Sequence, residues 1–435
     1  MLYLTGKNAN FLRRGANSAG TAWVTCNPTA STVGPLANVY DDDPSTPYIN
    51  GSNVANPWIK VDVNAIRSGD FEHATAVDGY LTEGGNAGDR WWSAVSGTGT
   101  AARTTTAGQF ETGTAGLALN GGTGYGLVSE YYRVQAGESR EISLRYKTST
   151  ASSVKVEIRN KHTGLYLHSD LTWVAAQAYC WNSVTADGTW RSATVAYTVE
   201  SLALCGGDEA VLSVTIINTV SGASYIDTVV DVPGVNFLSI HGHNIAGAWA
   251  SGKSQTPQVL QWSTDDSSWT NVSYVTKYAG SFYYTFSTLY KRWWRLYWDG
   301  TNRETMWIGE MVLGQARTCA TSPLYAGSSF DAQIPGVRSQ GPQGRVMNYR
   351  MAMNAALGAD LKFLAASRTT LDELIEGIWQ RSGQGRYPVV MVPDTNKPDV
   401  IFGRTIDPVR YTPTSATAYD AALRFVPDLL PTVGL

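Results

Sequence analysis

Hydrophobic and polar residues alternate with a period of two along much of this chain. The clearest runs are ISLRYK, VKVEIR and VLSVTI, in which every second residue is apolar. A period of two is that of a β-strand with one buried face. Gly, Ser, Thr, Asn and Asp are frequent between the runs, and these residues are typical of turns. The pattern therefore predicts a mainly β protein built from antiparallel sheets.

A repeated phrase indicates how the strands are divided between domains. The strand PWIKVDV is followed by Asn64, so that it ends in VDVN, and VDVP (230–233) comes directly before the apolar run VNFLSI (235–240). We expect one β-sandwich to be interrupted near residue 64 and to resume near residue 232. A second sandwich would be inserted between, with its two ends close together, as inserted domains require.

One strong helical signal lies in the last part of the chain, over Thr370–Arg381. Apolar residues at helical spacing form a single stripe there, consisting of Leu371, Leu374, Ile375, Ile378 and Trp379. Thr370 and Glu373 have the spacing of a capping box, and Gly383 suits a C-cap. The strand patterns YPVVMVPD, VIFGRTI and DAALRFV follow the helix. The Gly/Pro-rich stretch SSFDAQIPGVRSQGPQGR precedes it and is expected to be a linker.

The expected fold therefore has three parts. Two antiparallel β-sandwiches, one inserted in the other, are joined by a smaller C-terminal α+β domain with one amphipathic helix. The expected boundaries are 1–64 and 232–315 for the interrupted sandwich, 65–231 for the inserted one and 316–435 for the C-terminal domain.

Composition and charge exclude several classes of protein. The formal net charge is −3 and no basic cluster exists, which argues against nucleic-acid binding. No run of 18 apolar residues is present, so no membrane-spanning helix is expected. The start, MLYLTGKNANFLRR, lacks the features of a secretion signal, which disfavours a secreted protein. The four cysteines, Cys26, Cys180, Cys205 and Cys319, do not have zinc-site spacing. Cys180 and Cys205 are either two buried thiols or a disulfide pair.

Five segments outside the expected insertion follow one another in a characteristic order. They are NVYDDDPSTPY, PWIKVDV, VLQWSTDDSSWTNV, KRWWRLYW and IGEMVLG. This order resembles a discoidin-type, galactose-binding-like β-sandwich, although Asn64 stands where that family has Gly. The resemblance implies a structural Ca²⁺ ion, for which hard oxygen ligands in an acidic turn are suited. Its ligands would be Asp41, Asp43, Thr46 and Glu310. The alternative is an ordinary Asp/Pro turn with solvated carboxylates.

The expected insertion opens with RSGDFEHATAVDGY and ends with SYIDTVVDV, and Gly137 lies in its middle. These features resemble the jelly-roll carbohydrate-binding modules. The resemblance implies carbohydrate binding and a second calcium position, at Glu72 and Asp227, where the first and last strands meet. Buried carboxylates at such a position need a cation or hydrogen bonds.

Sugar rings dock on flat aromatic faces, and polar neighbours orient the hydroxyl groups. The aromatic candidates in the insertion are Trp91, Trp92, Tyr125, Tyr131 and Tyr132, with Asp89 and Arg90 as polar neighbours. Sandwiches of this kind also bury many aromatic side chains, so core packing is the alternative. Because Trp91 and Trp92 are adjacent, a strand would point one of them inward and the other outward.

The segment HGHN (241–244) is expected to form a tight corner, which Gly242 permits. His241 and His243 are two residues apart and could share a metal, but no third ligand is identifiable, so they are interpreted as structural. No GxSxG, HExxH, phosphate-binding loop or Cys-His constellation is present. An enzyme is therefore not expected.

The order of the helix, YPVVMVPD and FGR resembles minor or distal tail proteins of tailed bacteriophages. In those proteins a strand–helix–strand unit builds a ring around the tail axis. The resemblance implies a virion structural protein that assembles in the host cytoplasm. Its partners would be other tail proteins, further copies of itself in a ring and host-surface carbohydrate. The alternative is a stand-alone carbohydrate-binding or adhesin module of a bacterial surface protein.

Overall fold

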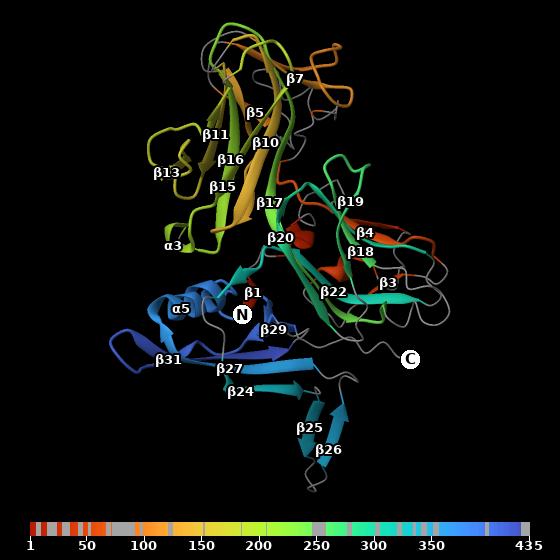
Figure 1. Ribbon diagram of the computed structural model, residues 1–435, viewed down its shortest axis with the longest axis vertical. Coiled ribbons are helices and arrows are strands. Elements are labelled where there is room, and N and C mark those ends of the chain that lie inside the picture. Colours follow the sequence, from red (N-terminus) through yellow and green to blue (C-terminus); the bar gives the residue numbers. More distant parts are fainter. Residues whose placement is uncertain are drawn as a thin grey trace. The chain divides into compact units, whose positions relative to one another are not determined.

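Figure 1 shows the computed structural model of the chain, in which strands dominate and the mainly β fold predicted from the alternation is confirmed. The structure describes residues 1–5, 10–14, 24–27, 35–41, 47–50, 54–66, 71, 92–95, 99–120, 125–150, 153–183, 185–205, 207–245, 258–275, 281–300, 305–319, 324–333, 336–340, 346–350, 356–395 and 400–427. The chain divides into two compact units. The inserted unit is 64–234, and the outer unit is 1–63 together with 235–435.

Two antiparallel sheets form the inserted unit. The first contains β6 (Thr100–Thr104), β7 (Gly116–Asn120), β10 (Ser139–Thr148), β15 (Arg191–Thr198) and the first part of β17 (Ser224–His243). The second contains β5 (Trp92–Val95), β8 (Tyr125–Ser129), β9 (Tyr132–Gln135), β11 (Val154–Asn160), β12 (Tyr166–Leu167), β13 (Trp173–Val174), β14 (Trp181–Asn182) and β16 (Glu209–Asn218). The one-turn helix α3 (Leu202–Cys205) precedes β16.

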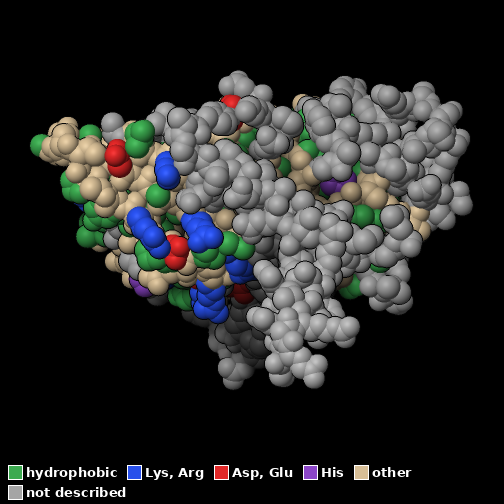
Figure 2. All heavy atoms as spheres, turned by 90° about the horizontal axis from the view of Figure 1, so that it is seen from below, with side chains coloured by type: hydrophobic (Ala, Val, Ile, Leu, Met, Phe, Trp, Pro, Cys, Tyr) green, Lys and Arg blue, Asp and Glu red, His purple; other side chains and the backbone are tan. Residues whose placement is uncertain are grey.

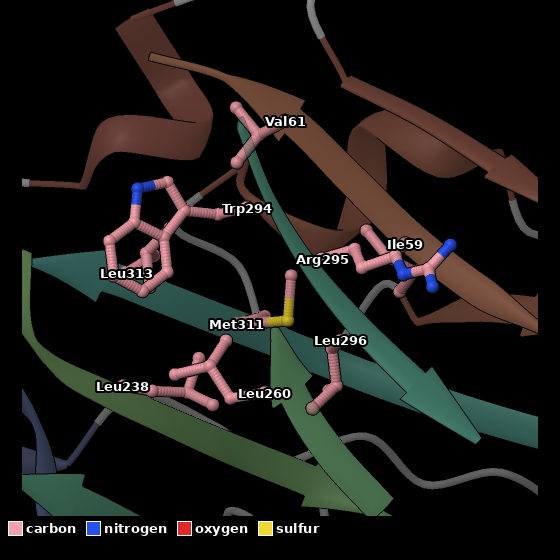
Figure 3. Close-up of a pocket in the computed structure, with 9 residues that line it drawn as sticks. All are labelled: Ile59, Val61, Leu238, Leu260, Trp294, Arg295, Leu296, Met311 and Leu313. Atoms are coloured by element: carbon pink, nitrogen blue, oxygen red, sulfur yellow. The ribbon is translucent and has the colours of Figure 1, made fainter. Parts of the chain in front are cut away.

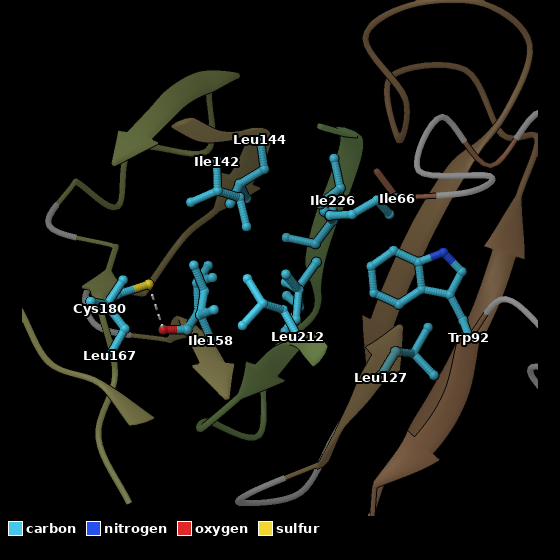
Figure 4. Packing of buried hydrophobic residues seen from close by; sticks show 14 of the residues in the cluster. Ile66, Trp92, Leu127, Ile142, Leu144, Ile158, Leu167, Cys180, Leu212 and Ile226 are labelled. Atoms are coloured by element: carbon cyan, nitrogen blue, oxygen red, sulfur yellow. Dashed lines mark hydrogen bonds between the residues drawn. The ribbon is translucent and has the colours of Figure 1, made fainter. Parts of the chain in front are cut away.

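The inward side chains of the two sheets form one apolar core. Figure 4 shows Ile142 and Leu144 of β10 facing Ile158 of β11 and Leu212 of β16. Buried and half-buried residues alternate along the whole of β10, which is the pattern expected from ISLRYK. Each fully buried Leu or Ile stabilises the fold by roughly 1.5–3 kcal/mol, so this core accounts for much of the stability of the inserted unit.

Cys180 and Cys205, whose pairing the sequence left open, are both free thiols in this core. The Cys180 thiol donates a hydrogen bond to the Val156 carbonyl at 3.3 Å. Burial raises the pKa of Cys180 to about 12. Both side chains therefore pack as small apolar groups.

The outer unit contains a β-sandwich of two sheets. One sheet consists of β2 (Val24–Asn27), β4 (Trp58–Asp62), β18 (Gln258–Ser263), β19 (Thr270–Val275) and β21 (Trp293–Trp298). The other consists of β3 (Tyr48–Asn50), the last part of β17, β20 (Phe282–Tyr290) and β22 (Met306–Gly314). The short helices α1 (Phe11–Arg14) and η2 (Leu36–Val39) accompany them. The expected β18–β19 hairpin is present, and Asp265 accepts the backbone N–H groups of Ser267 and Ser268 in its turn.

A small cavity lies between the two sheets of this sandwich. Figure 3 shows its lining, which consists of Ile59, Val61, Leu238, Leu260, Trp294, Arg295, Leu296, Met311 and Leu313. The Arg295 guanidinium lies elsewhere, 4.0 Å from the centre of the Trp269 ring. The cavity has room for about one water molecule, and its walls offer no polar partner. We therefore interpret it as a packing gap and not as a ligand site.

The outer unit also contains a larger sheet that joins both ends of the sequence. Its order is β23 (Arg317–Thr318), β1 (Leu2–Thr5), β28 (Val389–Val392), β29 (Ile401–Thr405), β31 (Ala418–Pro427), β27 (Ala356–Ser367) and β24 (Leu324–Gln333), and β30 (Arg410–Pro413) also pairs with β31. Tyr3 of β1 lies opposite Met391 of β28. The first strand of the chain, expected in the interrupted sandwich, therefore belongs to the C-terminal sheet.

The stretch expected to be a linker is largely strand. Its described residues belong to β24 and to β25 (Gly336–Gln340), and β25 pairs antiparallel with β26 (Val346–Arg350). On the strands β27, β30 and β31, Lys362, Arg410 and Arg424 are exposed. Figure 2 looks from below Figure 1 and shows Lys and Arg side chains gathered on this side of the molecule.

The predicted helix covers one face of this sheet. It begins as α5 (Arg368–Asp372) and continues as the π-helix η3 (Glu373–Gln380). Leu371, Leu374 and Ile378 are buried against the sheet, which confirms the apolar stripe. The capping-box prediction is wrong, because Ser367 is the N-cap and its Oγ accepts the Thr370 N–H at 3.2 Å. No helix of the described residues is long and apolar enough to cross a bilayer.

Candidate functional site

The aromatic side chains expected to bind sugar are mostly buried. Trp92 is 3% exposed, and its ring centre lies 5.7 Å from that of Phe71. Tyr125 and Tyr132 are also buried, whereas Tyr131 is 60% exposed. Since a buried ring has no free face for a sugar, Trp92, Tyr125 and Tyr132 must be reassigned from the binding site to the core. The other candidates, Trp91, Asp89 and Arg90, lie outside the described residues.

Tyr132 instead belongs to a buried polar network in the inserted unit. The Asp231 carboxylate accepts hydrogen bonds from the hydroxyl groups of Tyr132 and Tyr197 and, at 3.0 Å, from Nε of Arg140. Arg140 also donates to Glu138 at 2.5 Å. Burial and the Asp231 carboxylate raise the pKa of both tyrosines, so both remain hydrogen-bond donors. The members satisfy one another and are buried, which indicates a structural role.

The same network lies where the chain enters and leaves the inserted unit. The Ala65 N–H donates to the Asp231 carbonyl at 2.9 Å, and the Asp231 N–H donates to Oδ1 of Asn64 at 2.9 Å. The two ends of the unit are therefore hydrogen-bonded to each other, as an insertion requires.

The carboxylate expected at the calcium position of the inserted unit has protein donors. Asp227 is fully buried, and its Oδ2 accepts the backbone N–H groups of Glu111 and Thr112, both at 2.9 Å. The Thr112 hydroxyl donates to the same oxygen at 3.2 Å. These hydrogen bonds satisfy the carboxylate. Glu72 lies outside the described residues, so calcium binding there stays a prediction.

At the other calcium position, Asp41 is exposed and Glu310 is buried. Glu310 accepts a hydrogen bond from Nδ2 of Asn10 at 3.3 Å. Asp43 and Thr46 are not among the described residues. Within the described part of the chain, no three His, Cys, Asp or Glu side chains gather closely enough to hold a metal ion. Calcium binding here also stays a prediction.

The segment expected to turn at His241 instead continues as strand. β17 extends to His243 and pairs with β22 in the same register on both sides of Gly242, which has a φ of 54°. The neighbouring strand supplies the backbone partners that make the extended form stable. His241 is buried and lies 2.9 Å from the Ser239 hydroxyl, which agrees with a structural role.

A polar, partly exposed face with aromatic side chains lies on the second sheet of the inserted unit. Val154, Val156 and Ile158 point into the core, so strand alternation directs Lys155, Glu157 and Arg159 outward. Across the ladder these residues lie opposite Ile217, Thr215 and Ser213 of β16. Tyr166 of β12 lies opposite Arg159 on the other side. The segment before β14 runs beside β11, because the Cys180 N–H donates to the Val156 carbonyl at 2.9 Å. We call this surface the β11 face: Lys155, Glu157, Arg159, Lys161, Tyr131, Tyr166, Gln177, Tyr179, Ser213 and Thr215.

Each cation of the β11 face lies beside a tyrosine. Lys155 Nζ is 4.7 Å from the ring centre of Tyr179. The Arg159 guanidinium is 5.0 Å from that of Tyr166. Lys161 follows the end of β11 and is 4.8 Å from that of Tyr131. Cation–π contacts at these distances hold the rings and the charges in fixed relative positions.

Polar groups between the pairs provide further binding capacity. The Glu157 carboxylate accepts Nε2 of Gln177 at 2.7 Å and the Thr215 hydroxyl at 3.3 Å. Beside them, Ser213 Oγ and Arg159 Nε are buried and have no hydrogen-bond partner among the residues that the structure describes. Flat aromatic surfaces among fixed donors and acceptors are what an oligosaccharide requires, since sugars expose both apolar C–H faces and hydroxyl groups.

Sequence reasoning found only part of this face. The alternation of VKVEIR places Lys155, Glu157 and Arg159 on one side of a strand, and that signal was available. Tyr166 and Tyr179 come from other elements, and only the folded sheet brings them to β11. Of the expected aromatic candidates, Tyr131 alone among the described residues is on this face.

No family model matches the sequence, and no curated protein matches it. Several solved structures resemble part of the chain. One is the enzymatically active domain of tailspike protein 4 of bacteriophage CBA120, at 14% identity and a TM-score of 0.26, covering 39% of this chain and 21% of that one. Another is the endo-1,4-beta-D-xylanase 10B of Clostridium thermocellum, in its CBM22-1 and GH10 modules, at 17% identity and a TM-score of 0.25. This match covers 33% of this chain and 26% of that one. A third is the CBM22-2 xylan-binding domain from Paenibacillus barcinonensis, at 14% identity and a TM-score of 0.24. This match covers 35% of this chain and 97% of that one. The chain thus spans only about a fifth of the tailspike chain and a quarter of the xylanase chain.

Proposed function

We propose that the inserted unit binds carbohydrate through the β11 face and does so without catalysis. The observation that carries this proposal is the row of three tyrosines, Tyr131, Tyr166 and Tyr179, each lying beside a cation on one partly exposed face of a sheet. Surface rings that are fixed in place lose little conformational entropy when a ligand binds. Gln177 and Glu157 lie between two of the rings and supply donors and acceptors for hydroxyl groups.

Binding can be tested with the whole chain on a panel of immobilised polysaccharides. We expect Tyr179→Ala and Tyr166→Ala each to weaken binding by about tenfold, since a hot-spot aromatic contributes on the order of 1–2 kcal/mol. Tyr411→Ala is the matched control, because Tyr411 is 50% exposed but lies on β30 of the outer unit. Retention on no polysaccharide of the panel, or equal losses in all three variants, would refute the proposal.

For the outer unit we propose a structural role in the virion of a tailed bacteriophage, at the distal tail, with the C-terminal sheet joining copies of the chain into a ring. Six large hydrophobic side chains are exposed among the described residues. Three of them, Leu364, Ile406 and Tyr411, lie on the C-terminal sheet or in its connections, which supports this proposal. Exposed apolar side chains beside sheet edges favour association with another chain. Calcium, if bound, would have a structural role.

Native mass spectrometry of the whole chain tests the assembly. A closed ring of several copies is expected, and Leu364→Ser combined with Ile406→Ser should give monomers. A monomeric wild-type chain at micromolar concentration would refute ring assembly and favour a stand-alone binding module. The carbohydrate proposal would be unaffected, since it concerns the other unit.

A further inference from the structure

Within the described part of the chain, the cations of the β11 face have no carboxylate partner, whereas four arginines elsewhere in the inserted unit do. Arg133, Arg140 and Arg191 each form an ion pair, with Glu209, Glu138 and Asp187 respectively. Arg145 likewise pairs with Glu111. Within the described part of the chain, Lys155, Arg159 and Lys161 form no ion pair, and their contacts are with tyrosine rings.

The one acidic group of the face does not neutralise them. Glu157 lies between Lys155 and Arg159 on β11, but it is only 7% exposed and bonds to the neutral donors Gln177 and Thr215. The β11 face therefore carries three cations against one largely buried carboxylate. The chain as a whole has a net charge of −3, so the local charge of this face has the opposite sign to the net charge.

The cations are also spread out along the strand. A strand advances about 3.3 Å per residue, so Lys155 and Arg159 are separated by roughly 13 Å of backbone, and Lys161 lies beyond the end of the strand. A single small anion cannot reach all three charges. An extended chain with acidic groups at intervals can contact them in turn, while its sugar rings rest on the tyrosines.

We propose that the β11 face selects acidic polysaccharides, in which carboxylate or sulfate groups recur along the sugar chain. This inference rests on the proposed carbohydrate binding and specifies its ligand class. The tyrosines bind the apolar faces of the sugars, and the cations donate charge-assisted hydrogen bonds to the acidic groups, with Arg159 able to form the bidentate kind. A neutral polysaccharide would leave the three charges without partners.

The test compares polymers of galactose-type sugars that differ in charge. Polygalacturonate and a neutral galactan would be titrated against the whole chain by isothermal calorimetry, with chondroitin sulfate as the sulfated arm and poly-L-glutamate as a polyanion without sugar or aromatic rings. We expect polygalacturonate or chondroitin sulfate to bind at least about tenfold more tightly than galactan, with the advantage reduced at high salt because exposed charges are screened. Chondroitin sulfate carries carboxylate as well as sulfate groups, so tighter binding of chondroitin sulfate would identify sulfate as the preferred group, and equal or tighter binding of polygalacturonate would identify carboxylate.

Charge variants locate the effect. Lys155→Gln, Arg159→Gln and Lys161→Gln should each weaken acidic-polymer binding by about two- to fivefold, as loss of a solvent-exposed ion pair predicts, and should weaken galactan binding by a smaller factor, because only the support of the neighbouring tyrosine ring is lost there. Lys147→Gln is the control, because Lys147 is a cation on β10, in the other sheet of the same unit, that bonds to the Gly108 carbonyl at 2.8 Å. Near-ultraviolet circular dichroism would show that each variant is folded.

The possible failures are distinguishable. Equal binding of neutral and acidic polymers overturns the acidic selectivity but keeps carbohydrate binding. Binding of poly-L-glutamate as tight as that of the acidic polysaccharides also overturns it, because charge alone would then suffice. Binding of none of the polysaccharides overturns both the inference and the proposed function.

Discussion

Replacing Arg140 with methionine removes the centre of the buried polar network in the inserted unit. Arg140 has no exposed surface, and neither has Asp231. The guanidinium makes three hydrogen bonds: to Oδ1 of Asp231 at 3.0 Å, to the Asp231 carbonyl at 3.0 Å and to Glu138 at 2.5 Å. Burial alone would lower the pKa of Arg140, but the Asp231 and Glu138 carboxylates outweigh it and raise the pKa. The arginine is therefore charged in the folded protein.

The expected cost follows from what the substitution leaves behind. Methionine fills a similar volume, so the core loses little packing. The carboxylates of Asp231 and Glu138 remain buried with one charged partner fewer, and removing one partner of a buried ion pair costs about 3–5 kcal/mol. For a domain of roughly 150–250 residues this lowers the melting temperature by roughly 6–20 °C.

The assay must report on the inserted unit alone, because a chain with two units does not unfold in a single two-state step. Hydrogen exchange of the β10 amides, followed by mass spectrometry, meets this need. Arg145→Met is the matched control on the same strand, since Arg145 pairs with Glu111 at the surface and its loss should cost less than about 1 kcal/mol. Similar exchange in the two variants would show that the buried network contributes no special stability.

Four further outcomes are expected. Trp92→Ala should destabilise the inserted unit by about 3–5 kcal/mol through loss of core packing, as measured by exchange of the β8 amides, whereas unchanged exchange would place this side chain at the surface. Burial, reinforced by His243, lowers the pKa of His241 to about 3, and an unfolded histidine titrates near about 6.5. As the pH falls, the histidine therefore takes up a proton in the unfolded state but not in the folded state. The free energy of unfolding of the outer unit should fall by roughly 2 kcal/mol between about pH 7 and pH 5. Urea unfolding should show this loss for the wild type and a smaller one for His241→Gln, and equal losses would contradict it. EDTA should lower the melting temperature if calcium is bound, and an unchanged melting temperature with no metal in elemental analysis would remove that prediction. The fragment 64–234 should fold cooperatively alone, and an unfolded fragment would count against the boundary.

Local patterns predicted those parts of the fold that depend on one element and its burial. The alternation in VKVEIR and ISLRYK predicted β11 and β10, because a strand with one buried face must show it. The apolar stripe predicted the helix for the same reason. Its N-cap was placed three residues late, at Thr370, because Ser367 is also the last residue of the strand β27 and its capping role is visible only once the chain direction changes there.

The candidate site depends on which elements contact one another, and local sequence patterns do not predict contacts between distant elements. Alternation predicted that one of Trp91 and Trp92 points inward, but only the pairing of β5 with β8 decided that Trp92 does, because a shift of one residue in register exchanges the two faces. Tyr179 reaches Lys155 across 24 positions of sequence. β1 reaches β28 from the opposite end of the chain.

The sequence by itself therefore determined the class of fold, the strands and the helix, since these follow from backbone geometry and from the period with which side chains meet water or core. The tertiary structure alone decided the partners of those elements and hence the β11 face. Pairing between distant strands is selected by the packing of whole sheets, to which every residue contributes a little, and no single motif records it.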